Sequence, residues 1–584
     1  MHARAYTRVS GGLALGTRCP GPLRKTVTHL CECPGWVASS PVSSEALNIR
    51  RAMLERRWPD CPRFTPIATT FIAVTAVLNA LLYHLPLFSF AADNLDRSSV
   101  TADLTLATLL IVLLSETVVL LTLLALISHR LLKPFCMLMA LGNAIAVYFV
   151  VTYHVVLDET MMGNVLNTDL GEATEFLHPT LVVYVLALGI LPCGLLARVR
   201  IRPTPRSRLA GMALGYLSIT VLCCLLAARS WPWFDEHSKR VGGMIMPWSY
   251  VINAGRYLAP KLMASEVEAP LPPATFSSDE KTVVILVIGE AARAKNFQLY
   301  GYDRPTNPLL SKARVVALKN ATTCATYTTA AVRCMLSNVD AGSLFSKRYE
   351  SLPSYLQRNG IDVIWRTRNW GEPPIKVRTY QKASDLAADC AGARCAYDEV
   401  LLSRLEQRIK ASSSQRVFVV LHQSGSHGPA YYTKYPTEFE YFKPACKSVE
   451  LGKCTHDELV NAYDNTILYE DYFLVRVIGV LHQLPDTATL LIYVSDHGES
   501  LGEYGMYLHG IPYSIAPDVQ KDIPFIIWMS DTFVRENGVQ IVRLESQRVH
   551  SQRDIFHTVM GAFHMHSDAY AAKYDIFNEM FSNN

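Results

Sequence analysis

Charged residues are scarce in this chain of 584 residues. Only 18% are Asp, Glu, Lys or Arg, whereas half are hydrophobic. A soluble protein of this length would carry more charge, so the composition indicates an apolar segment joined to an ordinary globular one. The formal net charge of +4 is small for the length and gives no sign of a nucleic-acid partner. The length alone predicts at least two structural units.

A clean secretory signal peptide is also missing. The apolar run from Gly11 to Gly16 is too short and weak for the core of one. Met53 stands directly before a basic stretch and the first long apolar run. We therefore expect residues 1–65 to be a cytoplasmic tail, whose first 50 residues are disordered or precede the true start.

Long apolar runs are abundant in the first 230 residues. Five of them can cross a bilayer core of roughly 30 Å, which takes about 20 helical residues. They cover residues 67–90, 104–127, 135–156, 180–197 and 209–228. We predict a five-helix transmembrane domain over residues 66–230.

Basic residues crowd three of the loops around these runs. They are Arg50, Arg51, Arg56, Arg57 and Arg63 before the first run, Arg130 and Lys133 between the second and third, and Arg198, Arg200, Arg202, Arg206 and Arg208 between the fourth and fifth. The other loops are acidic, with only Arg97 as a basic residue. The positive-inside rule then places the N-terminus in the cytoplasm, and five crossings leave everything after residue 230 outside it.

Beyond the apolar runs, cysteines occur only in three close pairs. The pairs are Cys324 with Cys334, Cys390 with Cys395, and Cys446 with Cys454. Their spacing does not suit a zinc finger. An even set in a compartment predicted to be oxidising favours three disulfides, and adjacent pairing is the simplest connectivity.

The chain after residue 230 changes character twice. Residues 231–280 hold interfacial tryptophans and several prolines, and we expect an interfacial linker there. From Lys281 onward, short apolar runs alternate with helix-like segments. The predicted strands cover residues 282–288, 363–366, 417–421, 490–494 and 525–529, and helices are predicted at 399–410 and 457–484. This alternation predicts an α/β domain over residues 281–584, with a central, mostly parallel sheet covered by helices on both faces.

Polar residues directly follow two of these predicted strands. Glu290 comes after strand 282–288, and Asp496 and His497 come after strand 490–494. Sites in such sheets lie at the carboxyl ends of strands, and carboxylate oxygen with imidazole nitrogen suits zinc. Glu290 taken alone suits a helix cap equally well, so the prediction depends on a third element.

That third element is a hydroxyl-rich turn around Thr328, bracketed by Cys324 and Cys334. A disulfide here would restrict the unfolded chain by about 2–3 kcal/mol. The residues after Thr328 look helical, so its hydroxyl and nearby N–H groups can face an anion. Threonine is a poor nucleophile at neutral pH, but a bound zinc ion favours its alkoxide. The alternative is a closed surface turn without chemistry.

Four ordered blocks of sequence, at residues 284–293, 324–334, 421–432 and 495–503, resemble the lipid A phosphoethanolamine transferases. This family includes the mobile colistin-resistance enzymes and belongs to the alkaline-phosphatase-like (sulfatase) superfamily. The resemblance runs from about Met53 to the C-terminus and includes the five apolar runs and the cysteine pairs.

The resemblance implies a zinc-dependent enzyme with one zinc ion and room for a second. It implies that Glu290, Thr328, Asp496 and His497 bind zinc and that Thr328 is also the nucleophile. His427 and His509 match positions that bind the transferred group or a second zinc and assist proton transfer. His422 and Glu499 match supporting positions, although His422 suits a core-bonded histidine at a strand end equally well.

Two further regions hold candidate substrate-binding residues. Asn369 and Lys376 are counterparts of substrate-binding positions, but the segment between them is longer than in the family and holds two prolines. Asn164, Thr168 and Glu172 are spaced by four and share one face if helical. The resemblance makes that trio a binding surface for an ethanolamine headgroup, and the alternative is a solvated polar face.

Together these features predict a multi-pass protein of the bacterial inner membrane with a periplasmic catalytic domain, acting as a monomer. The resemblance implies transfer of phosphoethanolamine from phosphatidylethanolamine to a lipid A phosphate through a threonine adduct, which would weaken binding of polymyxins. Open alternatives are transfer to a lipopolysaccharide core sugar, and glycerophosphate transfer. A membrane-tethered receptor with an inactive site is a third class, against which the intact Glu290, Thr328, Asp496 and His497 weigh.

Overall fold

The computed structural model describes residues 64–96, 99–168, 170–263, 268–338, 349–539 and 549–578. The predicted cytoplasmic tail therefore lies almost wholly outside the described residues. The residues from Phe64 onward belong to one compact unit.

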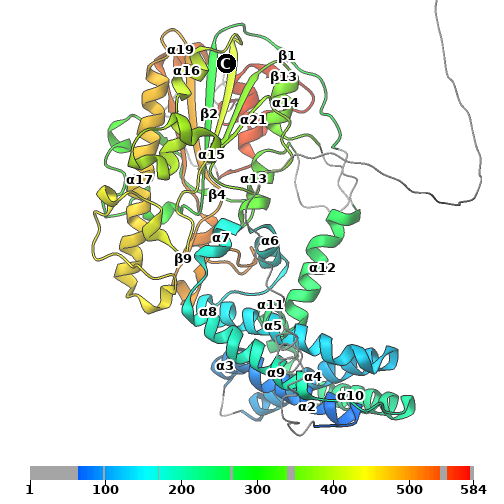
Figure 1. Ribbon diagram of the computed structural model, residues 1–584. Coiled ribbons are helices and arrows are strands. Elements are labelled where there is room, and N and C mark those ends of the chain that lie inside the picture. Colours follow the sequence, from blue (N-terminus) through cyan, green and yellow to red (C-terminus); the bar gives the residue numbers. More distant parts are fainter. Residues whose placement is uncertain are drawn as a thin grey trace, which may run out of the picture. The chain divides into compact units, whose positions relative to one another are not determined.

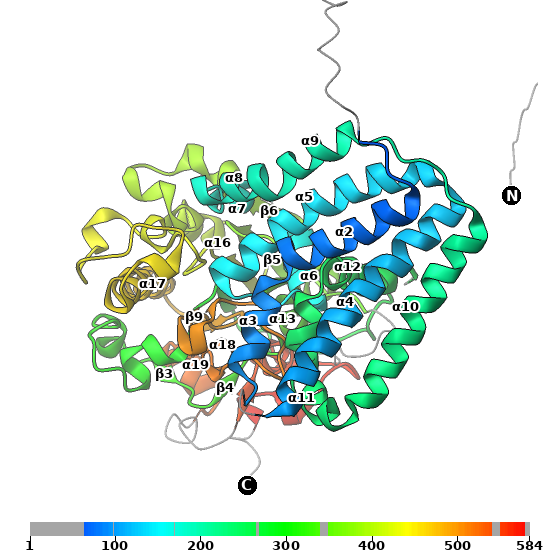
Figure 2. The same cartoon turned by 90° about the horizontal axis from the view of Figure 1, so that it is seen from below.

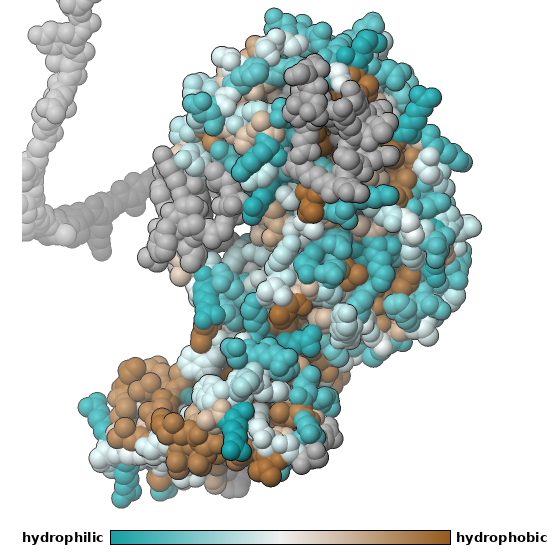
Figure 3. Space-filling model, turned by 180° about the vertical axis from the view of Figure 1, so that it is seen from behind, coloured by the Kyte–Doolittle hydropathy of each residue, from teal (hydrophilic) through white to brown (hydrophobic). Residues whose placement is uncertain are grey.

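The first half of this unit is a helical membrane region. Among the described residues, four helical segments are long and apolar enough to cross a membrane, and a bent pair makes up to five. They are α4 (Val100–Ile127), α5 (His129–Tyr153), the segment Pro179–Arg198 and α10 (Arg206–Leu226), with α2 (Ala68–Tyr83) and α3 (Leu85–Asp93) as the bent pair. Figure 2 shows α2, α4, α5 and α10 packed side by side, and brown hydrophobic atoms cover this part of the surface in Figure 3.

Two of these helical segments depart from the continuous helices that we predicted. The chain bends by 58° between α2 and α3, where Pro86 follows the break at His84. Segment Pro179–Arg198 consists of α8 (Pro179–Tyr184), a π-helical turn η1 (Val185–Ile190) and α9 (Leu191–Arg198). Pro192 has no N–H to give to the carbonyl of Leu188, which accepts from the Tyr83 hydroxyl instead (2.7 Å).

Four shorter helices stand between the membrane region and the sheet. They are α6 (Glu159–Asn167), α7 (Leu170–Glu175), α11 (Trp231–Met244) and α12 (Trp248–Met263). The last two occupy the segment predicted as an interfacial linker, which is therefore mainly helical up to residue 263. Figure 1 shows α12 rising from α11.

The second half of the unit contains a seven-stranded sheet. Its order is β3 (Val316–Ala317), β11 (Phe525–Met529), β8 (Ala488–Ser495), β2 (Thr282–Gly289), β7 (Arg416–His422), β5 (Asp362–Thr367) and β6 (Thr379–Lys382). The strands from β8 to β6 are parallel to one another, whereas β11 is antiparallel to β8. The predicted fold class is confirmed, because all five predicted strands lie in this mostly parallel sheet.

Strand β2 is buried along its whole length because helices cover both faces of the sheet. Val283, Ile285 and Val287 belong to one hydrophobic core, which includes residues of α17 (His456–His482). Val284 and its alternate neighbours belong to a second core with α14 (Leu352–Arg358) and α21 (Asp554–Ala562). Figure 1 shows α17 on one side of the sheet and α14 and α21 on the other. The period of two in a strand therefore divides β2 between two apolar layers.

The single helix predicted at residues 399–410 is wrong. The structure has a 3-10 helix η8 (Asp398–Leu402) and a separate helix α16 (Leu405–Lys410). Arg404 stands between them with φ of 48°. That left-handed conformation cannot continue a right-handed helix, so the helix must restart after it.

Candidate functional site

The carboxyl ends of β2 and β8 bring the first three candidate residues together. Gly289 pairs with Ser495 in the parallel register, so Glu290 and Asp496 emerge side by side. Oδ1 of Asp496 accepts hydrogen bonds from the backbone N–H groups of Ala291 (3.0 Å) and His497 (2.7 Å). These bonds fix the carboxylate so that Oδ2 lies 3.1 Å from Nε2 of His497.

Thr328 reaches the same place from another direction. It is the first residue of α13 (Thr328–Met335), and the predicted disulfide between Cys324 and Cys334 closes the loop around it. Its hydroxyl donates to Oε2 of Glu290 (3.3 Å) and lies 3.4 Å from Nε2 of His497. The other two predicted disulfides, Cys390–Cys395 and Cys446–Cys454, are also present.

The donor atoms of these four residues have the spacing that a tetrahedral zinc ion requires. Nε2 of His497 lies 3.1 Å from Oδ2 of Asp496 and 3.4 Å from Oε1 of Glu290. Ligands at about 2.0–2.1 Å from a tetrahedral ion lie about 3.3 Å from one another. All four side chains are buried, and burying two carboxylates together is costly unless a cation neutralises them. The residues present therefore fit a zinc ion.

The electrostatics of His497 agree with a role as a ligand. Burial, and to a smaller extent the neighbouring His509, lowers the pKa of His497 to about 4 against the opposing effect of Asp496. The imidazole is therefore neutral at physiological pH, as metal binding requires. Nδ1 lies 2.9 Å from the carbonyl oxygen of Gly498, which assigns the proton to Nδ1 and leaves the lone pair of Nε2 facing the cluster.

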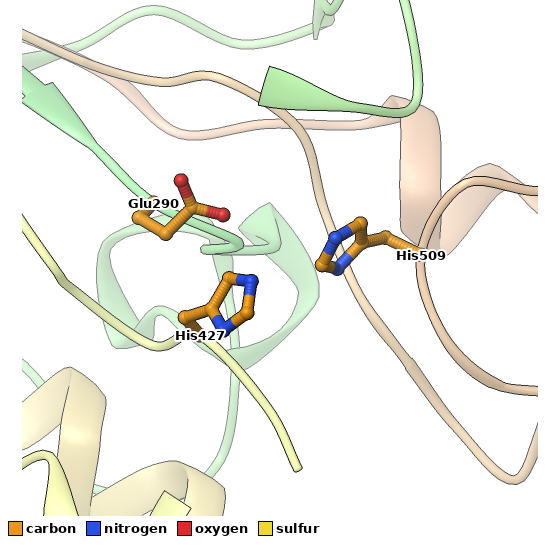
Figure 4. Close-up of side chains that lie close together, drawn as sticks. All are labelled: Glu290, His427 and His509. Atoms are coloured by element: carbon orange, nitrogen blue, oxygen red, sulfur yellow. The ribbon is translucent and has the colours of Figure 1, made fainter. Parts of the chain in front are cut away.

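Two further histidines lie beside this cluster. Figure 4 shows Glu290, His427 and His509 converging, and their ligand atoms all lie within 4.8 Å of one another. The ring of His509 lies 5.3 Å from that of His427 and 4.1 Å from that of His497. Both residues are slightly exposed, unlike His497, so they stand where the cluster opens outward.

Glu499 orients His509. Its Oε2 lies 2.8 Å from Nδ1 of His509, and its Oε1 accepts a hydrogen bond from the Tyr431 hydroxyl (2.5 Å). Burial, together with the negative charge of Glu499, raises the pKa of Tyr431 well above its ordinary value, so the phenol keeps its proton and donates. The predicted supporting residue Glu499 is thus in direct contact with a predicted catalytic histidine.

Of the remaining candidates in the α/β domain, one lies at the cluster and two lie away from it. Nδ2 of Asn369 donates to Oε2 of Glu290 (2.7 Å), so Asn369 joins the cluster. Lys376 does not, because its ammonium lies 3.4 Å from Glu268 on a side chain that is 72% exposed. His422 is buried at the end of β7, with Nδ1 3.7 Å from Glu372, as the alternative of a core-bonded histidine expects.

An apolar cavity of about 460 Å³ connects the membrane region with the histidines. Asn164 and Thr168 line it, together with apolar residues of α5, and His427 and His509 stand at its polar end. Two members of the predicted headgroup trio therefore face the same cavity as the catalytic candidates. The side chain of the third, Glu172, lies outside the described residues.

One contributor to the site was not predicted from the sequence. Asp398 accepts hydrogen bonds from the backbone N–H groups of Ser424 and Gly425, both at 3.0 Å, and so holds the turn before His427. Gly425 has φ of +49°, and a Cβ there would lie 2.8 Å from the backbone of Glu290. Glycine at this position was the available signal of a close approach between the two loops.

Comparisons with known proteins agree with this architecture. Residues 113–262 match the family described as phosphoethanolamine transferase EptA/EptB, and residues 282–565 match the sulfatase family. The chain is 40% identical to phosphoethanolamine transferase EptA of Helicobacter pylori over 494 residues, which cover 84% of this chain and 92% of that protein. It is 30% identical to phosphatidylethanolamine transferase Mcr-1 of Escherichia coli, over 80% of this chain and 89% of that one.

A solved structure extends the similarity to the fold of the whole described unit. The integral membrane protein lipooligosaccharide phosphoethanolamine transferase A of Neisseria meningitidis aligns with a TM-score of 0.81 at 27% identity. The alignment covers 88% of this chain and 99% of that one. Membrane region and sheet domain are thus both shared with that protein.

Proposed function

We propose that this chain, which belongs to the phosphoethanolamine transferase EptA/EptB family, moves phosphoethanolamine from phosphatidylethanolamine to a phosphate of lipid A. Family membership makes the chain an enzyme of this transferase class. The observation that carries the finer proposal is the position of the Thr328 hydroxyl, within 3.4 Å of both Glu290 and His497. The names of the relatives from Helicobacter pylori and Escherichia coli support the donor and the transferred group.

We assign the zinc site to Glu290, Thr328, Asp496 and His497, with His427 and His509 as ligands for a second ion or for the phosphoryl oxygens. A bound zinc ion lowers the pKa of a coordinated hydroxyl and stabilises negative charge on a phosphoryl oxygen. Asn369 and the backbone donors around Asp496 keep the acidic ligands oriented.

The reaction is a double displacement at phosphorus. The Thr328 oxygen gives up its proton and attacks phosphatidylethanolamine, and the bond from phosphorus to the glycerol oxygen breaks. The diacylglycerol oxygen takes that proton, and phosphoethanolamine remains on Thr328. A lipid A phosphate oxygen then attacks, the bond from phosphorus to the threonine oxygen breaks, and Thr328 recovers a proton from the acceptor phosphate. His509, oriented by Glu499, lies where it can carry the proton in either step.

The donor lipid reaches Thr328 through the apolar cavity. Its walls come from α5 and α6, and it ends at His427 and His509. The acyl chains can therefore contact the apolar walls while the polar headgroup lies at the histidines. Asn164 and Thr168 then meet the headgroup, and Glu172 is assigned to its ammonium.

This path requires the sheet domain to stand on the outer side of the membrane. We propose a cytoplasmic N-terminus and a periplasmic C-terminus, on the basis of the loops rich in arginine. A C-terminal fusion to a reporter that fluoresces only in the cytoplasm is expected to stay dark, while an N-terminal fusion fluoresces. Fluorescence from the C-terminal fusion would reject this topology.

Lipid A analysis tests the proposed reaction. Expression of the wild type in a bacterium without such an enzyme should add phosphoethanolamine to lipid A by mass spectrometry and raise polymyxin resistance. Thr328→Ala should abolish the addition, because no hydroxyl is left to form the adduct, whereas Thr328→Ser should keep part of it. Thr437→Ala, at an exposed threonine of the same domain, serves as the matched control.

Unmodified lipid A with the wild type, or equal modification with Thr328→Ala, would reject the proposal. The same spectra decide between acceptors, since phosphoethanolamine on the core sugar instead of a lipid A phosphate would favour the alternative acceptor. Labelled glycerophosphate in place of phosphoethanolamine would favour the alternative donor.

A further inference from the structure

A second cavity adjoins the cluster. It has a volume of about 560 Å³, and we call it the β6 pocket because Lys382, the last residue of β6, lines it. Asn369 and His427 belong to its wall. His427 also lines the apolar cavity, so this histidine stands between two cavities of different character.

The order of the strands explains why this pocket lies next to the site. Strands β8, β2, β7, β5 and β6 are neighbours and parallel, so all their carboxyl ends meet at one edge of the sheet. Three of the four assigned zinc ligands, Glu290, Asp496 and His497, follow β2 and β8. His427 follows β7, and Asn369 follows β5. Thr367 of β5 pairs with Lys382 of β6, so Lys382 lies at the same edge of the sheet, one strand further along.

The lining of the β6 pocket is suited to a phosphorylated sugar. The Ser384 hydroxyl can donate a hydrogen bond to a ligand, and the Thr433 hydroxyl, which donates to the carbonyl oxygen of Ala430, can accept one. The rings of Trp370 and Tyr397 provide faces on which a sugar can pack. This lining differs from that of the apolar cavity, which consists mainly of hydrophobic side chains of the membrane region. A lipid tail fits the apolar cavity, whereas a polar headgroup fits the β6 pocket.

Three cations line the β6 pocket, and Lys382 is the one with unused charge. Arg368 lies 3.7 Å from Asp398, and the ammonium of Lys434 lies 2.7 Å from Glu175. Within the described ranges, no carboxylate forms an ion pair with the Lys382 ammonium. A lysine without a counter-ion at the wall of a polar cavity is a ready partner for a phosphate.

We propose that the β6 pocket binds the sugar-phosphate headgroup of the glycolipid acceptor, with Lys382 pairing with an acceptor phosphate other than the one modified. This inference rests on the proposed function and adds separate places for the two substrates. The donor approaches Thr328 through the apolar cavity, and the acceptor approaches through the β6 pocket, which shares His427 with that cavity. Lys382 then sets acceptor specificity and has no part in forming the adduct.

The two half-reactions can be measured separately on the purified full-length protein. Without acceptor, a fluorescent phosphatidylethanolamine should give a burst of about one diacylglycerol per enzyme, which reports the adduct. With acceptor, steady-state transfer gives KM and kcat for lipid A carrying two phosphates and for lipid A carrying one. Lys382→Glu should leave the burst within about twofold of the wild type and raise KM for the two-phosphate acceptor at least about tenfold.

Two comparisons isolate the phosphate contact. The rise in KM should be below about threefold for the one-phosphate acceptor, because the partner of Lys382 is then missing. Lys382→Arg, which keeps the charge, should remain close to the wild type. Lys410→Glu is the matched control, since Lys410 is an exposed lysine on α16 that pairs with Glu406 outside the pocket.

Three results would overturn the inference. They are an equal loss in both half-reactions for Lys382→Glu, an unchanged KM for the two-phosphate acceptor, and an equal rise in KM for both acceptors. A wild type that gives no burst would instead reject the threonine adduct, and with it the proposed function on which this subsite rests.

Discussion

On the scale of single residues, two buried carboxylates at the site have different neighbours. Glu290 contacts the Thr328 hydroxyl and the Asn369 amide, and its Oε1 lies 3.4 Å from His497. Glu499 contacts His509 and the Tyr431 hydroxyl. The first set of contacts suits the metal ligand that we propose, and the second suits a group that orients the proposed proton carrier.

This difference predicts different losses for the same chemical change. Glu290→Gln should remove zinc from the purified protein and reduce transfer by more than about 100-fold, because a ligand charge is lost. Glu499→Gln should keep at least one zinc ion per chain and lower kcat by about 10- to 100-fold, because His509 loses its partner. Atomic absorption on dialysed protein and steady-state rates measure both effects. Equal zinc content in the two variants would contradict the assignment of Glu290.

Prediction of which candidate residues lie together succeeded where a residue directly follows a buried strand. Glu290, Asp496 and His497 do so, and parallel strands must end at a common edge. It failed for Asp398, whose function is visible only when two backbone N–H groups of a distant turn meet its carboxylate. No local sequence pattern predicts these contacts, since any acidic residue at the start of a helix would give the same pattern.

On the scale of elements, α13 places Thr328 at its first position. The disulfide Cys324–Cys334 joins the loop before α13 to its last turn, and Thr323 in that loop donates to the backbone oxygen of Asp496 (2.5 Å). The proposed nucleophile is therefore held by a covalent bond on one side and by the loop that carries Asp496 on the other. The Cys390–Cys395 disulfide has no such connection to Thr328 in the described structure.

Removal of each disulfide should show whether it contributes to stability alone or also to formation of the Thr328 adduct. Replacing Cys324 and Cys334 by serine should lower the free energy of unfolding by about 2–3 kcal/mol, and so should replacing Cys390 and Cys395, because both loops are short. Only the first pair should also slow formation of the Thr328 adduct, by about tenfold or more, because the hydroxyl is then less well placed. Thermal unfolding and the diacylglycerol burst measure the two effects. Equal bursts in both variants would contradict a positioning role for the first disulfide.

Elements were predictable where a single period dominates the sequence. The β-branched runs predicted five strands and the long amphipathic pattern predicted α17. Each of these elements is present, and its predicted bounds lie within two residues of the observed ones. The breaks were not predictable, because they depend on partners far away in the chain. The π-helical turn before Pro192 is stabilised by Tyr83, and Arg404 adopts a left-handed φ that no neighbour in sequence demands.

On the scale of the whole described unit, polar contacts join the membrane region to the sheet domain. The Lys434 ammonium lies 2.7 Å from Glu175, and the Tyr153 hydroxyl donates to the backbone oxygen of Val449 (3.1 Å). Lys434 follows the turn that carries His427, whereas Glu175 ends α7, one of the short helices between the membrane region and the sheet. This ion pair therefore connects the loop that carries His427 with α7, next to the cavity proposed for the donor lipid.

A charge exchange tests whether this connection matters for transfer. Lys434→Glu and Glu175→Lys should each lower transfer to lipid A by about tenfold, since each places two like charges in contact across a partly buried contact. The double variant restores opposite charges at the same two positions, so its rate should return to within about threefold of the wild type. Neither single change should alter zinc content, because neither residue contacts the cluster. If the fold-loss of the double variant equalled the product of the two single fold-losses, the two residues would act independently. The ion pair would then not be the contact that couples the membrane region to transfer.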